Sequence, residues 1–258
     1  MKKKLIKSHS TIIIGLSGGA DSVYLLYQLV TLQKEKNLTL IAAHLDHEWR
    51  VESKNDAQFC KQLCNTLNIP CIIKKGSELS FTPQQTGSKE DIGRQMRRYF
   101  FEEVRTHYNA DAIALAHHQD DQLETFFIRL SRGSSLEGLS GIKEQSEYYI
   151  RPLLNTSKQE ILHYLKNNNY NYTEDTSNAS DDYLRNRIRN KALPLLQECD
   201  TRFAKKCLET IGHIQDAEQF LKEHTHNMYQ SITYFDETNN TYILDCKKLL
   251  LLNTYLQK

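Results

Sequence analysis

Residues 10–22 have the sequence STIIIGLSGGADS, and this stretch decides the fold. Its first seven residues are mainly apolar and β-branched, which predicts a short buried strand. The next six, SGGADS at 17–22, place two glycines and two serines at a turn, and apolar residues then recur at helical spacing to Lys36. A strand, a glycine-rich turn and a helix in this order predict the first unit of an α/β fold.

Strand-like and helix-like segments continue to alternate up to residue 154. Further strands are expected at 38–45, 69–73, 111–116 and 148–154. Helices are expected at 53–67, 89–108, 120–130, 156–166 and 183–196, with a polar loop at 77–87. The alternation predicts a Rossmann-like parallel sheet of about five strands with helices on both faces. Ligands of such sheets bind at the carboxyl ends of the strands, near the point where the strand order reverses.

The composition is typical of a soluble globular protein. Its 258 residues are 39% hydrophobic and 25% charged, with a mean hydropathy of −0.60. No apolar run approaches the ~20 residues of a membrane-spanning helix, and polar residues 9–10 interrupt any signal peptide. After residue 199 glycine is nearly absent and 202–230 has helical periodicity. We therefore expect a domain at 1–198 and a small, mainly helical C-terminal region at 199–258.

The net charge of +1 favours no class of partner, so any nucleic-acid contact must come from local patches. The six cysteines include no CxxC pair and no zinc-ribbon spacing. Free thiols in a reducing cytoplasm are expected. Iron–sulfur or persulfide chemistry is the alternative, which this spacing does not favour.

Residues 17–22 have the chemistry of an anion cradle. Backbone N–H groups, two hydroxyls and the positive end of the following helix suit a phosphate. The loop lacks the Gly-Lys-Ser/Thr of a Walker A motif. Asp21 would repel a phosphate unless a cation intervenes, and Mg²⁺ bridging carboxylate and phosphate is the natural solution. The plainer alternative is an ordinary turn in which Asp21 caps the helix.

Acidic side chains and histidines follow two other expected strands. Asp120, Asp121 and Glu124 are spaced to share one helix face, where they favour Mg²⁺ or an ammonium group. The alternative is a solvated helix start stabilised by the dipole. His118 could take a proton, or it could be a packed structural histidine. HLDH at 44–47 ends the second strand, so its last two residues could orient a nucleotide or substrate, or only close a turn.

Two basic clusters could bind phosphates of RNA or ATP, with a solvated helix face as the alternative. The first lies on the 89–108 helix and comprises Arg94, Arg97, Arg98 and Arg105. The second contains no acid and comprises Arg185, Arg187, Arg189 and Lys191.

The order of these motifs resembles that of the tRNA(Ile)-lysidine synthetases of the PP-loop ATP-pyrophosphatase superfamily. The resemblance covers residues 10–197 and begins with SGGADS, the phosphate loop. The other matching segments are HLDH at 44–47 with Arg50 and Glu52-Ser53, HQDDQLET at 118–125, RGS at 132–134, RPLL at 151–154, EDTSN at 174–178 and RNRIR at 185–189. The chain departs from the family at Trp49, where a smaller apolar residue is usual, and at Arg97-Arg98-Tyr99, which replaces Arg-Tyr.

The resemblance implies ATP-dependent ligation of L-lysine to C2 of the wobble cytidine in a CAU-anticodon tRNA(Ile). The cytosine O2 would attack the α-phosphate and release pyrophosphate, and the ε-amine of lysine would then attack C2 and expel AMP. ATP and Mg²⁺ are the implied cofactors. The family's longer members carry a further C-terminal tRNA-binding domain, which is expected to be reduced or missing here. The oligomeric state is left open, with a homodimer among the alternatives.

The resemblance also implies roles for single residues. Those expected to be catalytic are Asp21, His118, Asp121 and Glu124, with Asp21 and Asp121 as metal ligands. Those expected to bind the nucleotide are Ser17, Gly18, Gly19, Ala20, Asp21, Ser22, Asp46 and His47. Those expected to contact substrate or tRNA are Arg94, Arg97, Arg98, Arg185, Arg187 and Arg189.

Two rival functions stay open. A PP-loop tRNA thiolase would use the same adenylation with a sulfur nucleophile, and it would need a cysteine at the site. A non-catalytic nucleotide or RNA binder would keep the loop, although the acids at 21, 121 and 124 argue against it.

Overall fold

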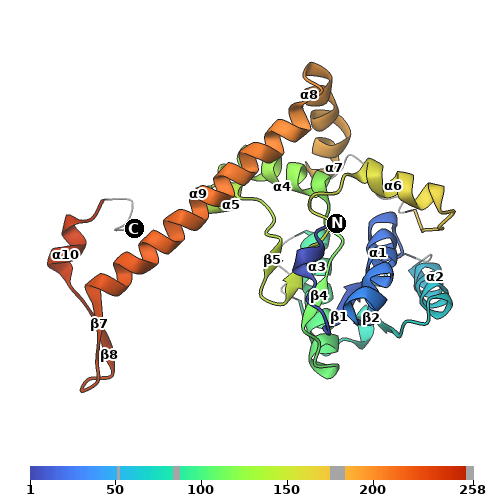
Figure 1. The fold of residues 1–258 in the computed structure, drawn as a ribbon, viewed down its shortest axis with the longest axis horizontal. Helices are drawn as coiled ribbons and strands as arrows, with labels where there is room; N and C mark the ends of the chain where they lie inside the picture. Colours follow the sequence, from blue (N-terminus) through green and yellow to red (C-terminus); the bar gives the residue numbers. More distant parts are fainter. Residues whose placement is uncertain (51–52, 84–87, 175–183, 254–258) are drawn as a thin grey trace. The chain divides into compact units, whose positions relative to one another are not determined.

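The computed structural model describes residues 1–50, 53–83, 88–174 and 184–253 (Figure 1). The chain forms two compact units. The first comprises Met1–Thr125 and Ile142–Leu193, and the second comprises Phe126–Gly141 and Pro194–Lys258. The division into domains 1–198 and 199–258 stays a prediction, and the compact units differ from it because 126–141 group with the C-terminal part.

The first unit is built on a six-stranded, mostly parallel sheet in the order β3-β2-β1-β4-β6-β5. Only β5 is antiparallel to its neighbour. The strands are β1 (Thr11–Gly15), β2 (Thr39–Asp46), β3 (Cys71–Lys75), β4 (Ala112–Ala114), β5 (Gln145–Ser146) and β6 (Tyr149–Ile150). The predicted Rossmann-like α/β class is confirmed, and the edge strand β5, too short to leave a periodic signal, was not expected.

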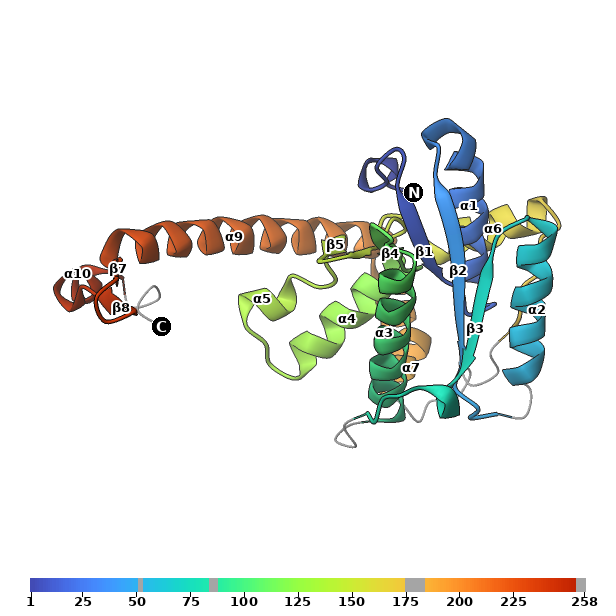
Figure 2. The same cartoon turned by 90° about the horizontal axis from the view of Figure 1, so that it is seen from below.

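Helices cover both faces of the sheet (Figure 2). Ile12 and Ile14 of β1 point into a core shared with α1, α2 and α6, whereas Ile13 points into a core shared with α3. This alternation follows from the two-residue period of a strand. The helical elements of this unit are η1 (Lys3–Leu5), α1 (Ala20–Lys36), α2 (Ser53–Thr66), η2 (Gly76–Glu78), α3 (Lys89–His107), α6 (Lys158–Asn167), α7 (Leu184–Arg187) and a π-helical turn (Ile188–Ala192).

The strand order reverses between β1 and β4. From β1 the chain adds β2 and β3 on one side, and it then returns to place β4 on the other side. The loop 17–22 follows β1, and α4 (Gln119–Ser131), which spans the boundary between the units, follows β4. The loop suited to bind a phosphate and the helix that begins with the carboxylates therefore both leave the sheet at its switch point.

The second unit is mainly helical, as expected. It contains α5 (Leu136–Leu139), α8 (Leu193–Cys199), α9 (Phe203–Ile232), the hairpin β7 (Thr233–Asp236) and β8 (Thr241–Leu244), and α10 (Cys246–Leu251). Within this unit Phe127 faces Phe203 with ring centroids 5.8 Å apart, and the Gln215 side-chain amide donates to the Ser140 carbonyl at 2.7 Å. Among the described residues, no helix has both the length and the apolar character needed to cross a bilayer.

Candidate active site

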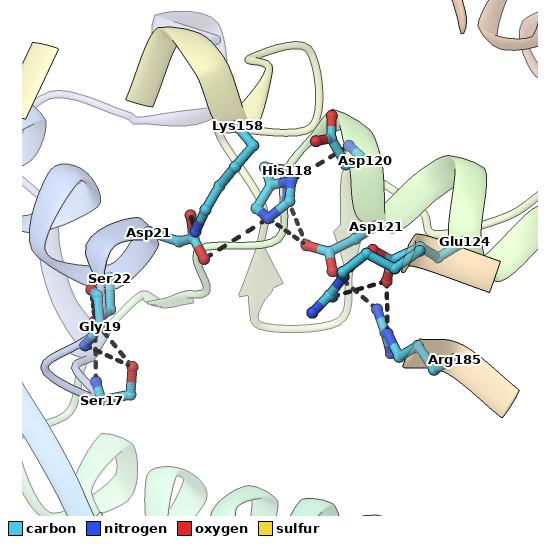
Figure 3. Close-up of polar contacts among 11 residues, drawn as sticks. Ser17, Gly19, Asp21, Ser22, His118, Asp120, Asp121, Glu124, Lys158 and Arg185 are labelled. Carbon is cyan, nitrogen blue, oxygen red and sulfur yellow. Dashed lines mark hydrogen bonds and ion pairs between the residues drawn. The ribbon is translucent and has the colours of Figure 1, made fainter. Parts of the chain in front are cut away.

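The loop 17–22 is held in shape by its own two serines (Figure 3). The Ser22 hydroxyl donates to the Gly19 carbonyl at 2.9 Å and accepts from the Ser17 backbone N–H at 3.1 Å. The Ser17 hydroxyl lies 3.0 Å from that of Ser22 and accepts from the Gly19 N–H at 3.3 Å. The serines therefore preform the loop, so that a bound anion would not have to order it.

Gly18 lets a distant segment close over this loop. Its φ of +91° lies in the region that favours glycine, and its carbonyl accepts from the Thr173 N–H at 2.9 Å. Gly19 and Thr173 form an isolated parallel bridge. Thr173 directly precedes the predicted EDTSN motif, which begins at Glu174. Residues 175–178 of this motif lie outside the described residues, and so does Glu52 of the motif after the second strand.

Asp21, the second residue of α1, lies between two cationic or protonatable groups. Its Oδ1 is 2.6 Å from the ammonium of Lys158, and its Oδ2 is 3.7 Å from Nε2 of His118. Its side chain is 30% exposed, so the carboxylate faces an opening rather than the core. Asp21 is thus placed where it could meet a ligand at the loop.

His118 links Asp21 to the carboxylate that follows β4. The backbone N–H of Asp120 donates to Nδ1 of His118 at 3.2 Å, so the neutral ring carries its proton on Nε2. Nε2 lies 3.5 Å from Oδ2 of Asp121, and the same oxygen accepts the backbone N–H of His118 at 2.9 Å. Burial raises the pKa of the Asp121 carboxyl, but His118, His117 and Arg185 outweigh it and hold the pKa below its usual value.

Glu124 is fully buried and is bonded by two arginines. Arg189 donates from Nε and Nη2 to its two oxygens at 2.6 and 2.9 Å. Arg185 donates to Glu124 at 2.7 Å and to Asp121 at 2.8 Å. The sequence predicted a cation at this carboxylate cluster and a phosphate at these arginines. In the structure, cluster and arginines compensate each other, as Figure 3 shows for Arg185.

The end of β2 brings Asp46 and His47 to the neighbouring strand end. Asp46 is buried and accepts the Glu48 N–H at 2.8 Å. His47 stacks on Trp49 with centroids 4.6 Å apart. Burial, and then the charge of Arg97, lower the pKa of His47 to about 4, so its ring is neutral at pH 7.

Three arginines of α3, at positions 94, 97 and 98, are more exposed than those near Glu124, whereas Arg105 is half-buried. Arg98 pairs with Glu102 at 2.9 Å and Glu147 at 3.0 Å, and Arg94 pairs with Asp91 at 3.3 Å. Arg97 lies on the same helix and is also solvent-exposed. Arg94 and Arg98 therefore pair with nearby acidic side chains and not with residues of the loop 17–22.

Residues 1–196 match the sequence family described as the PP-loop domain. The chain belongs to the PP-loop family. It is 36% identical over 263 residues to the tRNA(Ile)-lysidine synthase of Bacillus subtilis (strain 168), an alignment that covers 100% of this chain and 55% of that one. It is 37% identical over 225 residues to the enzyme of the same name from Clostridium perfringens, covering 83% and 48%. The chain thus spans about half the length of the curated relatives it matches.

A solved structure supports the PP-loop fold. The U34-tRNA thiolase NcsA from Methanococcus maripaludis, with its [4Fe-4S] cluster, superposes with a TM-score of 0.69 at 18% identity. The alignment covers 83% of this chain and 74% of the thiolase. At this identity the likeness concerns the fold alone.

Of the predicted site residues, the structure gathers those of the PP-loop, His118, Asp121, Glu124, Arg185 and Arg189. Arg187 is exposed on α7. Lys158 was missed. Its one sequence signal, a lysine in the first turn of a helix where the dipole disfavours a cation, becomes informative only when its partner is known.

Asp21 and Asp121 suit Mg²⁺ in donor chemistry. Both present carboxylate oxygens to the same imidazole edge, and Mg²⁺ is usually bound by one or two carboxylates plus substrate phosphates. In the described part of the chain, no three His, Cys, Asp or Glu side chains are arranged to hold a metal by themselves. A nucleotide would therefore have to complete such a site.

Proposed function

We propose that this chain uses ATP to adenylate the wobble cytidine of a CAU-anticodon tRNA(Ile) and then ligates L-lysine to its C2. One observation carries the proposal: His118 joins Asp21 of the PP-loop to Asp121 of α4 across the switch point of the sheet. Membership of the PP-loop family implies ATP, and the relatives named tRNA(Ile)-lysidine synthase support the choice of substrate.

The PP-loop binds the phosphates through the backbone N–H groups of its turn and the positive end of α1. Asp21 and Asp121 are the residues that would hold Mg²⁺, which supplies positive charge to the phosphate oxygens when bound. The cytosine O2 forms a bond to the α-phosphorus while the bond to the β-phosphate oxygen breaks, so pyrophosphate leaves. Asp21, His118 and Asp121, which lie between the loop and α4, would hold the cytosine and the α-phosphate in place.

In the second step the ε-nitrogen of lysine bonds to C2 while the C2–O2 bond breaks, so AMP leaves with that oxygen. The amine must lose a proton. Nε2 of His118 already carries one in the neutral ring, because Nδ1 accepts from Asp120. We therefore assign proton acceptance to Asp21, because the pKa of Asp121 is held below its usual value, and we assign His118 to positioning both carboxylates.

The thiolase alternative gains little support from the described cysteines. Cys60, although near the loop, is fully buried, and burial raises the pKa of its thiol. Such a thiol is a poor nucleophile, because the thiolate is the reactive form. The homodimer and the cytoplasmic location stay predictions.

The test is the transfer of labelled lysine to a tRNA(Ile) transcript with a CAU anticodon, with ATP and Mg²⁺, while pyrophosphate and AMP are counted. The methionine tRNA with the same anticodon is the control substrate. We expect ATP-dependent incorporation into the isoleucine transcript alone. Asp21→Asn and Asp121→Asn should abolish it, whereas Asp216→Asn, exposed on α9, should not.

Each other outcome has a definite meaning. Release of pyrophosphate without lysine transfer would keep the adenylation and reject lysine as the nucleophile, which favours the thiolase. ATP binding without either product would make the chain a nucleotide or RNA binder.

A further inference from the structure

We propose that Lys158 is a phosphate-binding residue, whose ammonium gives the PP-loop the positive charge that a Walker A loop carries as its own lysine. The inference rests on the proposed ATP-dependent function and names a further residue of that site.

Lys158 reaches the loop from a distant part of the chain. Its Nζ lies 2.6 Å from Oδ1 of Asp21, which is 137 residues away in sequence (Figure 3). The two side chains keep 35% and 30% of their exposure. The ammonium is therefore held at the mouth of the cradle and stays accessible to a ligand.

The contacts around α6 set this position. The Gln119 N–H donates to the Thr156 carbonyl at 3.0 Å, two residues before Lys158. The start of α6 is thus tied to the start of α4, beside His118. The ammonium is placed by the architecture of the site and not by a flexible surface loop.

The Lys158 ammonium does not stabilise α6, the helix on which it lies. Ser157 and Glu160 already cap α6 with a reciprocal pair of side-chain to backbone hydrogen bonds. A cation in the first turn of a helix is disfavoured by the helix dipole. The ammonium is therefore stabilised by Asp21, and the stability of α6 does not require a lysine at this position.

Charge explains what the pair can do. Asp21 places a negative charge inside an anion cradle, and the ammonium of Lys158 cancels it. A lysine ammonium is a compact charge on a flexible stem, so it can turn from Asp21 to a phosphate oxygen without backbone movement. The β- and γ-phosphates carry most of the negative charge of ATP, so we expect the loop and Lys158 to hold this pyrophosphate portion.

The experiment is calorimetric binding of ATP, pyrophosphate and AMP, each with Mg²⁺ and without tRNA or lysine. Lys158→Met should weaken ATP and pyrophosphate by about tenfold or more, the loss expected for one charge-assisted hydrogen bond, and should leave AMP within about twofold. Lys158→Arg should retain most of the affinity. Lys166→Met, an exposed lysine later on α6, is the matched control and should bind as the unmodified protein does.

Unchanged binding of ATP and pyrophosphate by Lys158→Met overturns the inference. An equal loss for AMP also overturns it, because that pattern indicates general damage to the loop. If Lys158→Met does not fold, Lys158→Gln takes its place, since it keeps a hydrogen bond to Asp21 without the charge. If the unmodified protein binds neither ATP nor pyrophosphate, the proposed function fails and the inference falls with it.

Discussion

Glu124 combines complete burial with two guanidinium partners. Glu124→Gln would remove the fully buried carboxylate that Arg185 and Arg189 share, and it would place a neutral amide among their guanidinium donors. Removing one partner of a buried ion pair typically costs about 3–5 kcal/mol. We expect a loss of that size in the free energy of unfolding, measured by urea denaturation.

The matched control is Glu103→Gln, which breaks an exposed ion pair with Lys74 at 2.8 Å. An exposed pair contributes about 0–1 kcal/mol, because water solvates both partners after the change. Equal losses for the two variants would contradict the view that Glu124 compensates the arginines, and these would then be available to an RNA phosphate.

His47 makes the stability depend on pH. Its folded pKa of about 4 lies below the ordinary value of 6.5, so between these values the unfolded chain binds more protons. The free energy of unfolding therefore rises with pH through this window, and stability is lost as pH falls from 6.5 towards 4. His47→Gln should reduce the slope by up to about 1.4 kcal/mol per pH unit, in urea unfolding across the window.

The control for this slope is His163→Gln, since His163 is exposed on α6 and bonds only to Asn167 in the described contacts. An unchanged slope in His47→Gln would show that the ring is not protected from protons in the folded protein.

Single residues of the site were found by sequence more readily than their partners were. Asp21, His118 and Asp121 stand beside strand ends, which a local pattern reveals. The contacts of Arg185 with Glu124 and of Lys158 with Asp21 join residues 61 and 137 apart. No local spacing contains that information, because it depends on how the strand order brings separate elements together.

At the scale of elements, the PP-loop depends on Gly18. A Cβ there would lie 2.9 Å from Oγ1 of Thr173 and 3.3 Å from Sγ of Cys60, on a backbone with φ of +91°. Gly18→Ala should lower the free energy of unfolding by about 1–3 kcal/mol and weaken ATP binding, since a side chain is strained in this conformation. Urea unfolding and calorimetry measure the two effects.

Gly212→Ala is the counterpart on α9, where a Cβ meets nothing within 4 Å. Alanine is a better helix former than glycine by about 1 kcal/mol, so this change should be neutral or stabilising. If the two substitutions had the same effect, the conformation given for Gly18 would be wrong.

The observed boundaries of two elements differ from those that the apolar pattern predicts, because backbone hydrogen bonding sets them. The third strand was expected from residue 69 but begins at Cys71, because Pro70 has no N–H and offers only its carbonyl, which accepts from Ala42 at 2.8 Å. The helix expected at 183–196 is described from Leu184 and is interrupted by a π-helical turn at Ile188–Ala192. Such a turn changes the hydrogen-bond pattern without a change in hydrophobic periodicity.

For the whole molecule, the composition change near residue 199 indicates where the C-terminal part begins, but not which earlier residues pack with it. Within the second unit, Phe127 packs against Phe203, and the Lys222 ammonium lies 2.7 Å from the Glu137 carboxylate. Residues 126–141 therefore belong with α9 in packing, although α4 carries the first of them in continuous helix from the first unit.

This packing predicts the effect of ending the chain after residue 198. Without α9, Phe127 and α5 lose their apolar and polar partners, so the shortened chain should bind a hydrophobic dye and be cleaved faster by trypsin after Arg129 and Arg132. A chain ended after Ile232 keeps α9 and removes only β7, β8 and α10, and it should behave as the full chain does. If the 198-residue chain resists trypsin and dye as well as the 232-residue chain, then 126–141 need no α9. The boundary at 198/199 would in that case also divide the folded units.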